Sequence, residues 1–190
     1  MQTQIKNKSG FTLIEMLVTI AIMLLLIGIA IPFEMSYRKK AEIKKSAKEL
    51  RSLFWEAQNR SLAPRDKDVT AYKISLTKNP AGGATIHLQE CKPSNNPSCI
   101  DITGGLEPKV ELGGNIIISD IQLYNGVSWV TRNSVSTAFF VGDGRSSGQI
   151  SFDYSGDKMT VILGSLIYPS LKYDIVVDGR MGSITYGVEQ

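Results

Sequence analysis

The chain has 190 residues, enough for one domain with a core of moderate size, and 43% of them are hydrophobic. Its 21 Lys and Arg residues stand against 18 Asp and Glu residues. A balance this even lacks the strong positive field of a dedicated nucleic-acid-binding domain, although local patches stay open. With two Cys, one His and no phosphate-binding loop, we expect neither a metal site nor a bound cofactor.

An apolar run follows a short basic N-terminal segment. The apolar run extends from Phe11 to Phe33, 23 residues with a single charged side chain, Glu15. As a helix it would span about 34 Å, enough to cross a bilayer. A carboxylate inside such a run costs about 2.5–3.5 kcal/mol, so Glu15 needs a partner. Cleavage of the chain after Gly10 would create one, the new amine of Phe11.

The segment Gly10-Phe11-Thr12-Leu13-Ile14-Glu15 resembles the processing signal of type IV pilins and type II secretion pseudopilins. The resemblance implies that a prepilin peptidase cuts after Gly10 and that Phe11 is then N-methylated. It implies that Glu15 pairs with the N-terminal amine of a neighbouring subunit during filament assembly. Pro32 sits where this family often has a helix-kinking proline, and it should bend the helix.

The same resemblance implies location and partners. We expect a single-pass protein of the bacterial inner membrane, with its C-terminal domain outside the cytoplasm, which then joins a filament. The expected partners are other pilins or pseudopilins, the prepilin peptidase and methyltransferase, the assembly platform of the inner membrane, and membrane lipids.

Two other interpretations of the N-terminus compete with this one. An ordinary secretory signal peptide would use Gly28-Ile29-Ala30 as its cleavage site, although the run is long for one. A plain membrane anchor would carry Glu15 without a role, although intramembrane carboxylates are functional by default. The mature chain would start at Phe11 in the first interpretation, at Ile31 in the second and at Met1 in the third.

A helical pattern continues beyond Phe33. Five apolar residues share one face at helical spacing: Ile43, Ala47, Leu50, Phe54 and Ala57. The helix should end near Leu62, because the residue before Pro64 is pushed out of the α region. We therefore expect a leader (1–10), a transmembrane half-helix (11–33), an amphipathic half-helix (34–63) and a β-rich domain (64–190).

The polar face of the second half-helix is basic. It carries Arg38, Lys39, Lys40, Lys44, Lys45, Lys48 and Arg51 against Glu42 and Glu49. Charge runs on helices are usually solvated faces. The alternatives are contact with anionic lipids, with acidic neighbours in a filament or with nucleic acid, for which the first five of these residues are the candidates.

From Val69 onward the apolar period changes to two, which is typical of strands. Nine strands are expected: 69–77, 84–89, 116–124, 128–131, 137–141, 149–154, 158–163, 173–177 and 181–186. Asn125-Gly126, Ser155-Gly156 and Asp178-Gly179 lie between them as turn signals. Residues 66–68 and 104–114 look like loops. The predicted fold class is α+β, a long N-terminal helix packed on antiparallel sheets.

Cys91 and Cys99 enclose a turn-rich segment. In an oxidising compartment we expect a disulfide closing this loop, worth about 2–3 kcal/mol. The alternative is two free thiols.

Two C-terminal segments resemble the GspH and FimT group of minor pilins. These are Phe139 to Ile150, a strand, Asp-Gly turn and strand, and Tyr173 to Arg180, a final hairpin ending in a Gly-Arg turn. Some FimT-type subunits bind DNA for uptake through a Gly-Arg-x-Arg motif. Here that motif reads Gly179-Arg180-Met181-Gly182, and acidic residues outnumber basic ones after Ile150. DNA binding is therefore the alternative function, and a minor pilin or pseudopilin is the leading one.

A catalytic role has little support. Gly144-Arg145-Ser146-Ser147-Gly148 matches the nucleophile-elbow pattern, but that mechanism needs a strand-to-helix turn and a downstream His. The flanks here look like strands and His87 lies upstream. We therefore expect no enzyme. His87 should be an ordinary strand side chain, and Trp55 and Trp129 should be packing residues.

Overall fold

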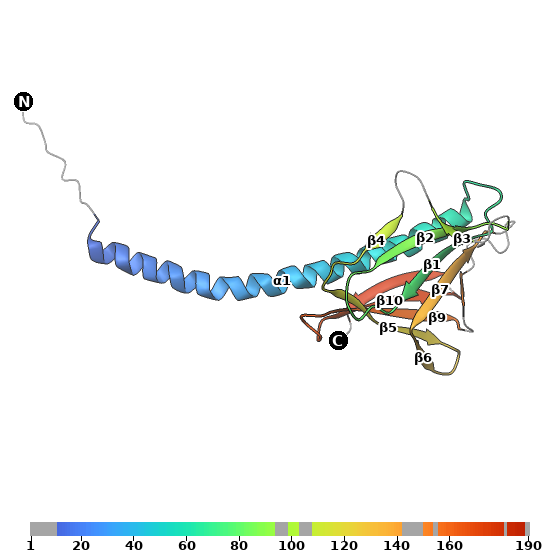
Figure 1. Cartoon of the computed structure of the whole chain (residues 1–190). Helices are drawn as coiled ribbons and strands as arrows, with labels where there is room; N and C mark the ends of the chain where they lie inside the picture. The colour runs from blue at the N-terminus through green and yellow to red at the C-terminus, as the bar shows by residue number, and fades with distance from the viewer. Residues whose placement is uncertain are drawn as a thin grey trace, which may run out of the picture. The chain divides into compact units, whose positions relative to one another are not determined.

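The computed structural model describes residues 11–93, 99–102, 108–141, 150–153, 156–180 and 182–188 (Figure 1). Within these ranges the side chains of residues 30–36, 39 and 188 are not described. The chain divides into two compact units, Met1–Lys40 and Ala41–Gln190. We call the second unit the head.

Helix α1 extends from Leu13 to Leu62. Thr12 caps its start, because the Thr12 hydroxyl oxygen accepts a hydrogen bond from the Glu15 backbone N–H at 3.3 Å. Its end at Leu62, two residues before Pro64, confirms the predicted boundary. The helix continues through Pro32, and the expected bend there stays a prediction. Among the described residues, no helix combines the length and the apolar character needed to cross a membrane.

Two antiparallel sheets build the rest of the head. The first has the order β3-β2-β1-β7-β8, with β4 also paired to β2; the second has the order β11-β10-β9-β5-β6. The strands of the first are β1 (Ala71–Thr77), β2 (Thr85–Cys91), β3 (Cys99–Asp101), β4 (Lys109–Glu111), β7 (Ser134–Phe140) and β8 (Ile150–Phe152). Those of the second are β5 (Ile116–Tyr124), β6 (Trp129–Arg132), β9 (Lys158–Ser165), β10 (Lys172–Asp178) and β11 (Ser183–Val188). A helix followed by antiparallel sheets confirms the α+β class.

One hydrophobic core joins the C-terminal part of α1 to both sheets. The five residues of the predicted stripe, Ile43 to Ala57, are each at most 2% exposed. They share one cluster with buried residues of both sheets, such as Ile74 and Phe139 of the first and Val161 of the second. The rings of Phe54 and Phe139 lie 6.3 Å apart. This part of α1 is therefore a structural component of the head.

Several local predictions are confirmed. The Cys91–Cys99 disulfide joins β2 to β3, with Cα atoms 3.9 Å apart. Asn125-Gly126 forms the turn between β5 and β6, where Gly126 adopts a φ of +93°. Asp178 pairs with Ser183 at the closed end of the final hairpin, β10–β11.

Other predictions are wrong. Trp55 is 62% exposed and Trp129 is 48% exposed, so neither is a core residue; Trp129 instead lies against the ring of Tyr124 at 5.3 Å. Strand β4 lies inside the segment expected to be a loop, because pairing with β2 stabilises a strand too short to show a period.

Candidate functional site

The N-terminal part of α1 exposes apolar side chains on all sides. From Phe11 to Ile29 every large apolar side chain is more than half exposed, from 51% at Val18 to 82% at Leu13. Glu15 lies in the first turn, where its backbone N–H is held by Thr12. A helix that is apolar all round needs cover from lipid or from other helices. Gly10 lies outside the described residues.

The predicted basic face is exposed where it is described. The side chains of Arg38, Lys40, Lys44 and Lys45 are all exposed, and that of Lys39 is not described. Lys45 reaches Glu49 at 3.7 Å while remaining 77% exposed, so this ion pair is weak. Lys40, Lys44 and Lys45 thus present positive charge to solvent on α1.

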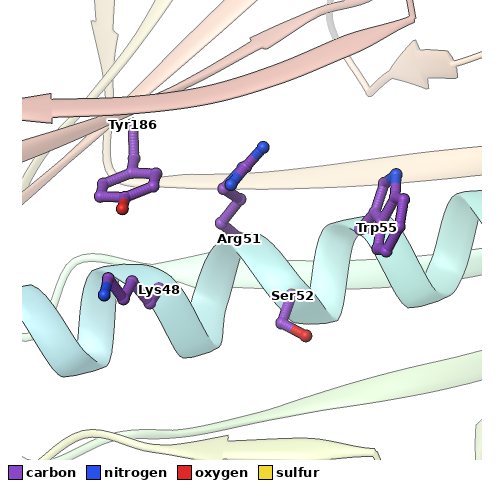
Figure 2. Close-up of a pocket in the computed structure, with 5 residues that line it drawn as sticks. All are labelled: Lys48, Arg51, Ser52, Trp55 and Tyr186. Carbon is purple, nitrogen blue, oxygen red and sulfur yellow. The ribbon is translucent and has the colours of Figure 1, made fainter.

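A groove lies between α1 and strand β11 of the head (Figure 2). It has a volume of about 380 Å³ and is lined by Lys48, Arg51, Ser52 and Trp55 of α1 and by Tyr186 of β11. In Figure 2, Arg51 stands between the rings of Tyr186 and Trp55. The groove therefore combines two cations with two aromatic rings.

Arg51 is held in place at this groove. Its Nε–H donates to the Ile184 carbonyl oxygen at 3.0 Å, and its guanidinium lies 5.4 Å from the centroid of the Tyr186 ring. A cation over an aromatic face is attracted by the ring quadrupole. In the described parts of the chain, neither Lys48 nor Arg51 has a carboxylate partner, so both charges can meet an external anion.

The C-terminal hairpin has a different electrostatic character. Arg180 forms an ion pair with Asp157, and this hydrogen bond raises the Arg180 pKa. Lys158 lies 3.1 Å from the carboxylate of Asp178, which is 4% exposed. Because these cations are engaged by carboxylates, the hairpin offers little to a phosphate group.

The comparisons with known proteins bear on the N-terminus. Residues 5–31 match the prokaryotic N-terminal methylation motif. No curated protein and no solved structure matches the chain. The matched segment includes the Gly10-Phe11 junction, Glu15 and most of the apolar run. The chain therefore carries a type IV pilin-like prepilin signal.

The N-terminal methylation motif sets the class of protein. It indicates a structural subunit that is processed by prepilin peptidase and assembles with other pilins, and it implies anchoring in the inner membrane before filament formation. It does not indicate an enzyme. Ser146 lies outside the described residues, and His87 is a partly buried side chain of β2. Among the described residues, no cluster of three His, Cys, Asp or Glu side chains could hold a metal.

The groove combines residues that the sequence separates. Lys48 and Arg51 belong to the predicted basic face, whereas Trp55 was assigned to packing. The sequence position of Trp55 could have shown that it is exposed. Trp55 follows Phe54 directly, so it is rotated about 100° from that member of the buried stripe. Tyr186 has no such signal, because it is brought to α1 only by the folding of β11.

Proposed function

We propose that this protein is a minor pilin or pseudopilin of the GspH and FimT group. It is anchored by residues 11–33 in the inner membrane and then joins the tip or initiating complex of a pilus or pseudopilus. The observation that carries this proposal is the methylation motif at residues 5–31, which leads into a helix with apolar side chains on every side.

Burial of the apolar side chains of that helix drives both membrane anchoring and filament assembly. A large apolar side chain gains about 1.5–3 kcal/mol when it is fully buried. Lipid provides this cover before assembly, and the equivalent helices of neighbouring subunits provide it afterwards. Since both surroundings are apolar, the subunit can pass from membrane to filament without exposing the helix to water.

Glu15 sets the axial alignment of neighbouring helices in the filament. Its carboxylate would be unpaired in an apolar helix bundle, and an uncompensated buried charge costs about 3–5 kcal/mol. The amine of Phe11 on a neighbouring subunit, released by cleavage after Gly10, removes this cost at one axial position only.

Two segments of the head support the GspH and FimT assignment. Strands β7 and β8 pair as the first resemblance requires, with Phe139 opposite Ile150. Strands β10 and β11 form the final hairpin. Residues 142–149, which include the Asp-Gly turn of the first segment, lie outside the described residues.

Replacement of the carboxylate tests the proposal. Glu15→Gln should leave cleavage and methylation of Phe11 intact, as measured by mass spectrometry of the cellular protein. Its recovery in sheared filaments should fall at least about tenfold, because an unpaired amine is left in an apolar environment.

Glu49→Gln is the matched control, since it removes a partly exposed carboxylate of the same helix outside the apolar run and should assemble normally. Normal recovery of Glu15→Gln, or an intact leader on the wild-type chain, would overturn the proposed function.

A second candidate function is binding of single-stranded nucleic acid at the groove. Bases stack on aromatic side chains with about 1–3 kcal/mol each, and neighbouring cations track the phosphates. Trp55, Tyr186, Lys48 and Arg51 supply both kinds of contact. We therefore propose this alternative for the groove between α1 and β11, and not for the hairpin turn whose cations are paired with carboxylates.

A gel-shift titration of the detergent-solubilised chain with a short single-stranded oligonucleotide tests this candidate. Trp55→Ala should weaken binding about fivefold or more, and Lys48→Gln should reduce its salt dependence. Trp129→Ala is the control, because that ring is also exposed but lies outside the groove. Equal effects of the two Trp substitutions, or no shift at low salt, would exclude it.

A further inference from the structure

One end of the head lies around its first residues, Ala41 and Glu42, in the middle of α1. The Glu42 carboxylate lies against Gly113, since a Cβ on that glycine would meet Glu42 Oε1 at 2.9 Å. Two backbone hydrogen bonds hold loops together beside it, from Leu166 N–H to the Asn115 carbonyl at 2.9 Å and from Gly83 N–H to the Ile116 carbonyl at 3.2 Å. We call this group of loops the base of the head (Figure 1).

The β9–β10 loop displays two adjacent aliphatic residues at the base. Leu166 is 45% exposed and Ile167 is 52% exposed. The loop is shaped by Ser165, a residue only 4% exposed, whose hydroxyl oxygen accepts hydrogen bonds from the N–H groups of Ile167 and Tyr168, both at 3.2 Å. The sequence here is Leu166-Ile167-Tyr168-Pro169, so an amphipathic ring follows the aliphatic pair.

The rest of the base leaves room for this loop. The ideal Cβ position of Gly82 lies 2.9 Å from Leu166 Cδ1, so the Leu166 side chain packs directly over this glycine. The Leu166 contact and the Ser165 hydrogen bonds together give this loop a defined conformation. Contiguous exposed apolar side chains mark sites of contact with proteins or membranes.

The length of the chain limits how far the base can move from the membrane. Ala41 follows Phe33 by eight residues, a distance of about 12 Å in a helix and at most about 28 Å in an extended chain. The headgroup layer of a bilayer is about 5–8 Å thick. The base thus stays close to the lipid surface that holds the apolar helix.

We propose that Leu166 and Ile167 insert into the headgroup layer of the membrane, so that the head rests on the lipid before the subunit is withdrawn into a filament. Tyr168 suits the same layer, because amphipathic rings favour the membrane–water interface. The exposed Lys44, near the start of the head, complements anionic headgroups. This inference rests on the proposed membrane anchoring of residues 11–33.

The test uses the full chain in vesicles of neutral and anionic phospholipid. Ile167→Cys is labelled with an environment-sensitive fluorophore, and lipids carrying a shallow nitroxide quench it. Val127→Cys is the matched control: Val127 is an 88% exposed aliphatic residue in the β5–β6 turn, at the end of β5 away from the base. The native cysteines form a disulfide and do not take the label.

We expect quenching at position 167 to exceed that at position 127 at least threefold. Equal quenching, or none at either position, would overturn the inference. A label at 167 that nitroxide lipid does not quench, but whose emission shifts to the blue as the protein-to-lipid ratio rises, would identify a second copy as the partner and would overturn the inference too. Alkaline extraction of the same vesicles separates the two proposals: a chain that resists extraction without quenching at 167 refutes only the lipid contact.

Discussion

Gly82 shows how strongly one residue can depend on its neighbours. Its φ is +78°, a left-handed conformation that costs other residues about 1–2 kcal/mol. A Cβ at this position would also lie 2.2 Å from the Gly114 carbonyl oxygen, a backbone atom that cannot turn away. Both constraints require glycine at the base of the head.

We therefore expect Gly82→Ala to lower the free energy of unfolding by at least about 2 kcal/mol. Gly114→Ala is the control, because a Cβ there meets no atom within 4 Å, and its effect should stay within about 1 kcal/mol. Urea denaturation of the two variants, followed by circular dichroism, measures the difference. Similar midpoints would contradict this account of the loop.

At the scale of elements, an ion pair ties the two sheets together. Lys78 follows β1 of the first sheet, and its Nζ lies 2.6 Å from the carboxylate of Asp120 on β5 of the second. Partial burial raises the Asp120 pKa. The hydrogen bonds from Lys78 and Gln122 lower it by more than burial raises it, so the Asp120 pKa lies below its ordinary value. A lowered folded-state pKa stabilises the fold above the unfolded pKa of about 3.9. The stabilisation disappears as pH falls through the folded value.

Asp120→Asn should therefore cost about 1–2 kcal/mol at pH 7, and the cost should shrink towards zero as the pH falls through the folded-state pKa of Asp120. Asp68→Asn, at an exposed position, should cost less than about 0.5 kcal/mol throughout. Thermal unfolding at a series of pH values compares the two. A cost for Asp120→Asn that does not change with pH would rule out the ion pair as its cause.

Strand β5 shows where prediction from the apolar pattern fails. The extent of β5 is predicted correctly at 116–124, but its core residues are Ile116, Ile118, Ile121 and Leu123, which change phase midway. The cause is a register shift against β9 between Ile118 and Asp120. A bulge adds one residue to one strand and resets the alternation. Strict period two would have turned Ile121 towards solvent.

At the scale of the whole molecule, local features were predictable and distant ones were not. The buried stripe of α1 follows from one helical period, and the N-terminal signal is a contiguous motif. The pairing of β1 with β7, with Ala71 opposite Phe140, joins segments whose local patterns do not encode their partner. The groove depends on such a distant meeting, since Arg51 and Ile184 are 133 positions apart.

Side chains of α1 cover part of the exposed edge of the second sheet. Arg51 donates to the carbonyl oxygen of Ile184 on β11, the outermost strand on that side, and Gln58 donates to that of Gly182, just before the strand. Unsatisfied edge carbonyls invite strands of other molecules to pair and aggregate. Because these acceptors are occupied within the chain, this edge is less able to pair with a strand of another molecule and so to start aggregation.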